Sequence, residues 1–212
     1  MDISLITKTF ITFFTVIDPL GLVPVVIVIL ANNNPKDRKK IITRAVIISA
    51  LVIFVFALLG KFLIESLGIG LYAFNIAGGV LLFLIALDML FGRTPGTRET
   101  PIEEKEAISS SDVSVFPLAI PMIAGPGTIA TTILFTDNAS GNNMNILILA
   151  VVLILILFIA WVVMIKSSLI MKLIGRTGIL VFSRILGIIL AALAVQYILN
   201  GIQTFLKLNG FI

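Results

Sequence analysis

The sequence has no cysteine and no histidine among its 212 residues. Without cysteine it has no disulfide, no thiolate metal site and no cysteine nucleophile. Without histidine it lacks the commonest metal ligand and the side chain that titrates nearest neutral pH. We therefore expect no metal centre and no bound cofactor, and we expect carboxylates to carry out any proton handling.

Charged residues are scarce as well. They make up 12% of the chain, whereas 59% is hydrophobic and the mean hydropathy is +1.19. A soluble domain is about one quarter charged, so the composition excludes that class. The net charge of +4 arises from 15 basic and 11 acidic residues and is typical of basic cytoplasmic loops rather than of nucleic-acid binding. We expect an integral membrane protein in contact with the lipid bilayer, with no nucleic-acid partner.

Six long apolar runs divide the chain, and each reaches the roughly 20 residues that a helix needs to cross a bilayer. Backbone groups in lipid must pair within their own segment, which favours helices, and the runs lack the alternation of β-strands. We predict an all-α integral membrane protein with six transmembrane helices. The predicted spans are Leu5–Ala31, Ile41–Gly60, Leu67–Phe91, Val113–Phe135, Ile146–Ile165 and Ile179–Leu206.

Basic residues are distributed unevenly between the two sides of these spans. Twelve of the 15 lie in or beside the connections 32–44, 93–112 and 166–178, whereas the other side carries Lys8, Lys61 and Lys207. The positive-inside rule predicts that the three connections are cytoplasmic and that both termini lie outside. The 93–112 connection is rich in glutamate and serine, which fits a regulatory segment or a solvated linker, and we favour the linker.

The two halves of the sequence match at an offset of 106 to 108 residues. Segment 17–21 aligns with 123–127, and the glycines of the third span align with those of the sixth. We predict two three-helix repeats, 1–92 and 113–212, joined by the 93–112 linker within one membrane domain. Because three spans is an odd number, the second repeat is predicted to be inverted, as in many secondary transporters.

The first and fourth spans contain proline and glycine near their midpoints. The first has Asp18-Pro19-Leu20-Gly21 and Pro24, and the fourth has Gly125-Pro126-Gly127-Thr128. Proline removes a backbone donor and clashes with the preceding turn, so these motifs predict either two kinks or two helices broken mid-membrane. We favour the breaks, because two symmetric interruptions with a carboxylate in one of them indicate a site.

Such breaks have a definite binding chemistry. The half-helix after each break presents N–H groups and a positive dipole end to a carboxylate, while carbonyls freed before it suit an ammonium group or a cation. A small zwitterion such as an amino acid needs both. Asp18 is the main candidate, because a carboxylate at that depth is costly unless it is paired or functional. It is predicted to bind the substrate amine, to hold a coupling cation, to carry a proton, or only to cap the following half-helix.

Other polar residues of the spans carry less weight. Asp88 lies near the cytoplasmic end of the third span and is expected to face the headgroups. Asn75, Gln196 and Asn200 are expected to form hydrogen bonds between helices.

On these motifs the sequence resembles the MarC-related membrane proteins, a family that includes the SnatA-type small neutral amino-acid transporters. The resemblance rests on Asp18 to Gly21 with Pro24, and on Pro117 to Pro121 followed by Ala124 to Thr128. It extends over nearly the whole chain. It implies a bacterial or archaeal inner-membrane protein that transports glycine, alanine and similar amino acids with proton coupling.

We therefore expect a secondary transporter of small neutral amino acids that works by alternating access, with proton or sodium coupling. The alternative is a channel or passive facilitator for small solutes. An enzyme is not expected, because the chain lacks a nucleophile with a base, and Asp18 and Asp88 are too far apart in depth to act as a pair. The predicted substrate-binding residues are Asp18, Pro19, Gly21, Pro24, Gly125, Pro126, Gly127 and Thr128, and Asp18 is also the predicted coupling-ion residue.

Overall fold

The computed structural model describes residues 3–92, 112–139 and 142–211, of which 88% are helical and none lies in a strand. The predicted all-α class is therefore confirmed. The predicted linker 93–112 lies outside the described residues, apart from Asp112. In chain order the elements are α1 (Ile3–Ile17), α2 (Leu22–Ile29), α3 (Pro35–Ser66), α4 (Leu71–Phe91), η1 (Ser114–Ile123), α6 (Pro126–Ala139), α7 (Asn143–Ile165) and α8 (Ser167–Leu208).

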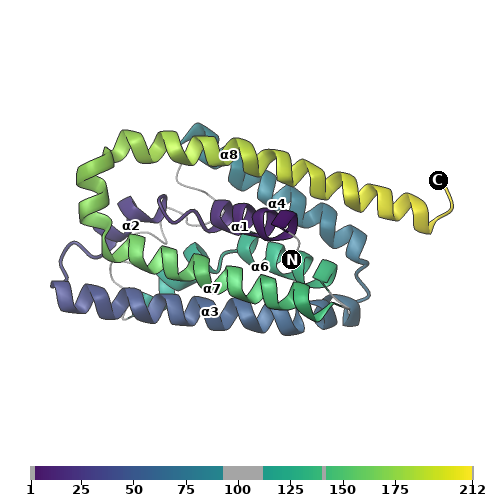
Figure 1. Cartoon of the computed structure of the whole chain (residues 1–212), viewed down its shortest axis with the longest axis horizontal. Helices are drawn as coiled ribbons and strands as arrows, with labels where there is room; N and C mark the ends of the chain where they lie inside the picture. The colour runs from purple at the N-terminus through teal and green to yellow at the C-terminus, as the bar shows by residue number, and fades with distance from the viewer. Residues whose placement is uncertain (1–2, 93–111, 140–141, 212) are drawn as a thin grey trace.

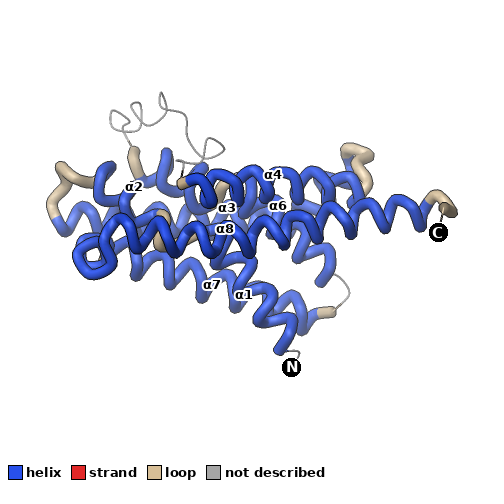
Figure 2. Tube along the Cα trace, turned by 90° about the horizontal axis from the view of Figure 1, so that it is seen from above, coloured by secondary structure: helices blue, strands red, loops and turns tan. Residues whose placement is uncertain are grey.

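The long helices run roughly along one common direction (Figures 1 and 2). The α1–α2 segment packs against α7 and α8, whereas η1 and α6 pack against α3 and α4. The apolar part of Ile3–Ile29 is 56% buried, compared with 22–39% for the four long outer helices. Those outer helices expose large apolar side chains, such as Leu58 of α3 and Phe158 of α7. Apolar surface of this extent fits lipid rather than water.

Five helical segments are long and apolar enough to cross a membrane, and the pair η1–α6, bent by 54°, makes a sixth if it is one span. Ion pairs hold both ends of this pair beside α3. The Arg44 guanidinium lies 2.8 Å from the Asp112 carboxylate, and the Lys61 ammonium lies 2.8 Å from that of Asp137. Arg44 and Lys61 are 17 residues apart, or about 25 Å along the helix axis. Because a bilayer core is about 30 Å thick, we count η1–α6 as one span, which gives the predicted six.

Two connections that were predicted as loops are largely helical. α3 begins at Pro35, where the Asn34 side chain accepts a hydrogen bond from the Asp37 N–H (2.9 Å). α8 begins at Ser167 and turns a corner at Gly175, which has φ +72° (Figure 1). The loop predictions for 32–44 and 166–178 were therefore wrong over most of their length. Hydropathy marks the part of a helix that crosses lipid, and it misses basic ends that are themselves good helix formers.

α4 and α8 run antiparallel and approach most closely at glycine residues. A Cβ atom on Gly79 would lie 2.8 Å from the Ala194 carbonyl oxygen, and one on Gly201 would lie 2.7 Å from the Tyr72 carbonyl oxygen. Since no side chain fits at such distances, glycine allows the two backbones to pack directly, as in other pairs of membrane helices.

Candidate functional site

The first span is interrupted at residues 18–21, between α1 and α2. Asp18 has φ +46°, a left-handed conformation that aspartate adopts more readily than most residues. Because Asp18 precedes Pro19, right-handed helical backbone angles are also disfavoured for it. Backbone pairing continues past this point, because the Val23 N–H donates to the Leu20 carbonyl (3.1 Å). Pro24 has no N–H to donate to the Leu20 carbonyl, but this carbonyl is occupied by the Val23 N–H.

The Asp18 carboxylate is buried, with 4% of the residue exposed. Its Oδ1 accepts a hydrogen bond from the Gly21 N–H, and its Oδ2 accepts one from the Ser183 hydroxyl of α8, each at 3.1 Å. A Cβ on Gly21 would lie 2.2 Å from Asp18 Oδ2, so glycine is required for the carboxylate to lie here. Asp18 thus bonds to Gly21, the residue just before α2, and also joins the first span to α8.

Ser183 is part of this site, and sequence analysis did not identify it. It is 9% exposed and stands in a long apolar stretch next to Arg184. A single serine or threonine in a membrane helix commonly bonds to its own backbone, as Thr9, Thr12 and Thr15 do in α1. Nothing in the local sequence therefore distinguishes Ser183 from these residues.

The second interruption lies between η1 and α6. Phe116 and Ile120 have extended backbone angles inside η1, and α6 starts at Pro126. The buried Thr128 hydroxyl donates to the Ile123 carbonyl (2.9 Å) and so bridges the interruption. The first N–H groups of a helix have no acceptor within that helix, so those of Gly127 and Thr128 have no partner within α6.

The remaining predicted site residues differ in exposure. Pro19, Gly125 and Gly127 are buried, Gly21 and Pro24 are half-buried, and Pro126 is exposed. A Cβ on Gly125 would lie 2.3 Å from the Pro121 carbonyl oxygen. Gly125 therefore has a packing role within its own turn that does not depend on any ligand.

The two interrupted spans are neighbours in the core. A Cβ on Gly127 would lie 2.6 Å from Ile85 of α4 and 3.5 Å from Val16, which is two residues before Asp18. The rings of Phe13 in α1 and Phe135 in α6 are 5.3 Å apart. The structure thus brings the two predicted motifs to the same region, while the Asp18 carboxylate is directed at α8 through Ser183.

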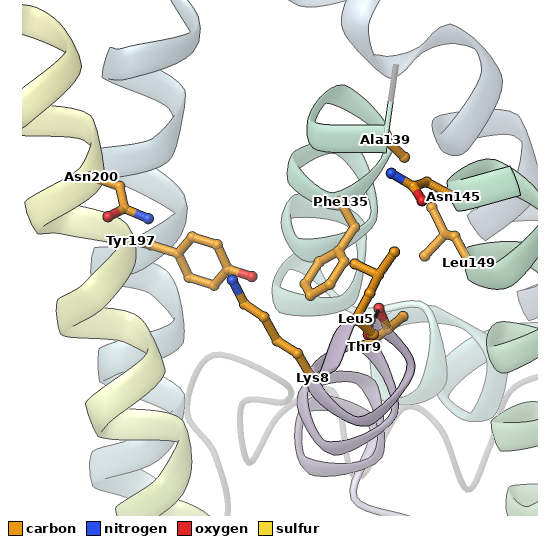
Figure 3. Close-up of a pocket in the computed structure, with 9 residues that line it drawn as sticks. All are labelled: Leu5, Lys8, Thr9, Phe135, Ala139, Asn145, Leu149, Tyr197 and Asn200. Atoms are coloured by element: carbon orange, nitrogen blue, oxygen red, sulfur yellow. Dashed lines mark hydrogen bonds between the residues drawn. The ribbon is translucent and has the colours of Figure 1, made fainter. Parts of the chain in front are cut away.

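Two cavities lie at opposite ends of the interrupted first span. The α1 cavity, of about 230 Å³, is lined by residues of α1, α6, α7 and α8, among them Thr9, Phe135 and Tyr197 (Figure 3). The α2 cavity, of about 210 Å³, is lined by Val26 of α2 and by residues of α3, α7 and α8. Asp18 lies between them in the chain, nine residues after Thr9 and eight before Val26, and lines neither cavity.

Packed side chains separate the α1 cavity from the interruptions. Phe135 lines the cavity and packs at a tilted angle against Phe13, which is fully buried. One turn deeper on α6, the hydroxyl of Thr131 is buried and has no hydrogen-bond partner among the described residues. Gly127 follows after one further turn. A route from the α1 cavity to the interruptions would therefore pass the two phenylalanine rings and then an unpaired hydroxyl.

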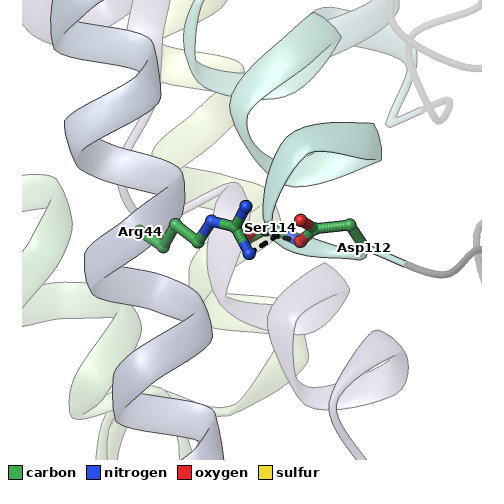
Figure 4. A network of polar contacts seen from close by, with 3 residues as sticks. All are labelled: Arg44, Asp112 and Ser114. Atoms are coloured by element: carbon green, nitrogen blue, oxygen red, sulfur yellow. Dashed lines mark hydrogen bonds and ion pairs between the residues drawn. The ribbon is translucent and has the colours of Figure 1, made fainter.

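The Arg44–Asp112 pair marks the other end of the bundle, where η1 begins (Figure 4). The Ser114 hydroxyl donates to Asp112, and this hydrogen bond, with the Arg44 charge as a smaller cause, lowers the pKa of the Asp112 carboxyl. Among the described residues, no three acidic side chains lie close enough together to hold a metal ion.

Residues 3–206 match the family of MarC integral membrane proteins. The chain is 35% identical over 206 residues to a UPF0056 membrane protein of Methanocaldococcus jannaschii, covering 96% of this chain and 98% of the relative. It is 34% identical over 197 residues to the UPF0056 inner membrane protein YhgN of Escherichia coli K12, covering 91% and 93%. No solved structure matches the chain. With the apolar helical bundle described above, these similarities establish that the chain belongs to the MarC family of integral membrane proteins.

Proposed function

We propose that this protein is a secondary transporter of small neutral amino acids in the inner membrane, and that it works by alternating access. The observation that carries the proposal is the buried Asp18 carboxylate, which lies at an interruption of a largely buried span and between two cavities at opposite ends of that span. An ionisable group inside a membrane bundle marks a transport or proton pathway more often than a structural position. The inner-membrane location is supported by the similarity to YhgN, an inner membrane protein of Escherichia coli.

The proposal includes two inverted repeats, and the contacts between helices support them. An offset of 108 residues carries Gly79 onto Gly187, Ala86 onto Ala194 and Leu90 onto Ile198. Gly79 lies against Ala194 and Ile198, and Gly187 lies against Ala86 and Leu90. The α4–α8 interface therefore has the contacts that a twofold axis between the halves requires.

The partners of the two interrupted spans follow the same rule. The α1–α2 segment packs against α7 and α8, and η1–α6 packs against α3 and α4. Exchanging the halves replaces α7 by α3 and α8 by α4, so each set of contacts becomes the other. This arrangement supports breaks at matching depths in the two repeats, which is the architecture on which rocking-type transport is built.

The choice of a small zwitterion rests on the groups near the interruptions. Asp18 offers a carboxylate to an ammonium group, and the first N–H groups of α6 suit a carboxylate. Both cavities, at about 230 and 210 Å³, are smaller than the roughly 300–1,000 Å³ of pockets for drug-sized ligands. A solute the size of glycine or alanine fits these limits, and we propose transport rather than chemical conversion.

The proposal is tested by reconstituting the protein in liposomes and following labelled glycine and alanine. We expect accumulation against a concentration gradient when a proton or sodium gradient is imposed, and loss of accumulation when that gradient is dissipated. A passive channel would only equilibrate the label. Equilibration without accumulation under both gradients would replace the transporter with the channel, and no movement of either amino acid would reject both.

The role of Asp18 is tested by Asp18→Asn, which changes little except charge. Asparagine also adopts positive φ readily, caps a helix about equally well and can bond to Ser183. We therefore expect a normally folded variant that has lost gradient-driven accumulation. If Asp18 carries the coupling proton, exchange between equal pools persists. If it binds the substrate ammonium, exchange affinity falls about ten- to a hundredfold, as for one charge-assisted hydrogen bond.

Asp88→Asn serves as the matched control, because Asp88 is a half-buried aspartate of α4 that the proposal does not use. We expect that variant to accumulate alanine as the parent protein does. Normal accumulation by Asp18→Asn would remove the carboxylate from the mechanism and leave it as a helix cap.

A further inference from the structure

The α1 cavity contains polar groups that the proposed mechanism at Asp18 does not use. Its polar lining consists of Lys8 and Thr9 of α1, Asn145 of α7, and Tyr197 and Asn200 of α8. Figure 3 shows the Lys8 ammonium and the Tyr197 hydroxyl pointing toward the same part of the cavity. No acidic residue is among the described residues that line it, so none of these residues offers the lysine a counter-charge.

The Tyr197 hydroxyl is the least satisfied group of this cavity. Tyr197 is only 5% exposed, and its hydroxyl is buried without a hydrogen-bond partner among the described residues. Buried polar groups in native proteins are nearly always paired, and an unpaired one calls for a missing water, ion or ligand. The hydroxyl is directed at the cavity (Figure 3), so its partner would be an occupant of the cavity.

Asn200 adds a second donor with a fixed orientation. Its Oδ1 accepts a hydrogen bond from Gln196 Nε2 (2.8 Å), so this bond holds the carbonyl end of the amide. The amide nitrogen lies on the side of Tyr197 (Figure 3). Thr9, in contrast, donates its hydroxyl hydrogen to the Leu5 carbonyl (2.7 Å). The cavity therefore combines the positive charge of the exposed Lys8 with a hydroxyl and an amide that are both able to donate.

From this arrangement we infer that the α1 cavity is a binding site for the carboxylate group of a small solute, held by Lys8, Tyr197 and Asn200. Carboxylates accept from several donors at once, and charge-assisted bonds are the strongest of these. The cavity of about 230 Å³ has the volume of about eight waters at roughly 30 Å³ each, which suits a short-chain acid or a small amino acid. The inference rests on the proposed function only for naming alanine as the physiological solute.

This site is separate from Asp18. Lys8 precedes Asp18 by ten residues on the first span, or about 15 Å of helix, and the Phe13–Phe135 pair lies between them. In the transport proposal the α1 cavity is the first binding site, where the solute carboxylate is held before the solute passes the rings of Phe13 and Phe135.

The chain itself supplies the probe for a test. Tyr72 and Tyr197 are its two tyrosines, so labelling with 3-fluorotyrosine gives two fluorine resonances, and Tyr72→Phe identifies the one from Tyr197. The labelled protein, in a neutral maltoside micelle that brings no lipid phosphate, is titrated with sodium propionate, alanine, alaninamide and sodium chloride. We expect propionate and alanine to shift the Tyr197 resonance saturably, and we expect neither alaninamide nor chloride to do so.

Substitutions of Lys8 then test the proposed contact between its ammonium group and the bound carboxylate. Lys8→Gln should raise the dissociation constant of propionate about ten- to a hundredfold, as expected for the loss of one charge-assisted bond. Lys8→Arg should largely preserve it. Lys207→Gln is the matched control, because Lys207 is at the exposed end of α8 and does not line the cavity.

Several results would overturn the inference. These are a Tyr197 resonance that no carboxylate moves, an equal shift with alaninamide or chloride, and an unchanged dissociation constant in Lys8→Gln. The titration uses no membrane gradient, so it is independent of transport. Saturable binding without accumulation in liposomes would reject the transporter and keep the site. Accumulation with an unresponsive Tyr197 would reject the site and keep the transporter.

Discussion

Asp18 combines three roles in one residue. It turns the backbone at φ +46°, it accepts a hydrogen bond from Gly21 just before α2, and it reaches α8 through Ser183. A carboxylate inside a bilayer costs several kcal/mol, whereas a hydrogen bond to a charged group contributes about 1.5–3 kcal/mol. Two such bonds offset much of that cost. Protonation of the carboxylate, or the arrival of an ammonium group, would therefore change the contacts that hold the first span to α8.

Gly21→Ala tests this connection without changing any charge. Gly21 has φ −63°, which alanine adopts freely, so the backbone need not change. The added methyl group would lie 2.2 Å from Asp18 Oδ2, and the carboxylate must move away from its present position. We expect loss of gradient-driven alanine uptake and a lower unfolding temperature in detergent. Loss of the Ser183 hydrogen bond alone corresponds to about 1.5–3 kcal/mol.

Ser183→Ala is the companion variant, because it removes the same hydrogen bond from the other side. Both variants should impair uptake in the same direction, and the double variant should be less impaired than the sum of the two, since they remove one interaction. Full uptake by Gly21→Ala would show that the position of the carboxylate on α8 is unimportant for transport.

At this scale, sequence analysis located residues whose chemistry is unusual for a membrane span. Asp18, Gly21 and Thr128 stand out in apolar runs, and the structure gives each of them a specific contact. Ser183 was missed because its importance depends on a partner 165 residues away. Tyr197 and Lys8 were missed for the same reason, because only the fold brings them to one cavity.

At the scale of whole helices, composition predicted position better than it predicted length. The centres of all six predicted spans are helical or lie at an interruption within a helical segment, but α3 and α8 extend well beyond the apolar runs. Their extensions carry basic residues and a capping asparagine, to which a hydropathy profile is blind. The corner at Gly175 likewise depends on one backbone angle rather than on hydrophobicity.

The α4–α8 interface should be sensitive to single methyl groups. Gly79→Ala and Gly201→Ala would each place a Cβ within 2.8 Å of a backbone carbonyl oxygen, and backbone atoms cannot rotate away as side chains can. We expect each variant to lower the free energy of unfolding by about 1–3 kcal/mol, as overpacking usually does. Thermal unfolding in detergent, followed by circular dichroism, measures the effect.

Gly178→Ala is the control for this experiment. It lies on α8 as Gly201 does, but its added methyl group would meet a side-chain atom, the Cγ2 of Ile174, rather than a backbone atom of another helix. We expect a clearly smaller change in stability. Equal gains in all three variants would mean that helix propensity, which favours alanine over glycine, determines the response at these positions rather than close packing. Equal losses would mean that the close contacts with backbone carbonyls are not what makes Gly79 and Gly201 sensitive.

Charged residues mark both ends of the bundle along its long axis. Arg44 pairs with Asp112 at one end of η1–α6, and Lys61 pairs with Asp137 at the other. The start of α1 and the later part of α8 line one cavity, so the beginning and end of the described chain share one end of the bundle. An even number of spans requires this arrangement. The excess of basic residues at the opposite end predicts which side that end faces, since basic loops are retained in the cytoplasm.

Side-specific labelling tests this orientation, and the natural absence of cysteine allows it without any prior substitution. Ser110→Cys places a thiol in the 93–112 connection, and Asn209→Cys places one just after α8. With a membrane-impermeant maleimide added to intact cells whose outer envelope is permeable, we expect Asn209→Cys to react at once. Ser110→Cys should react only after the inner membrane is opened, because its side carries twelve of the 15 basic residues and the positive-inside rule therefore predicts that it is cytoplasmic. The opposite pattern would invert the molecule and place the α1 cavity on the cytoplasmic side. Labelling of both thiols in intact cells would mean an even number of spans between them, and the count of η1–α6 as a single crossing would then be wrong.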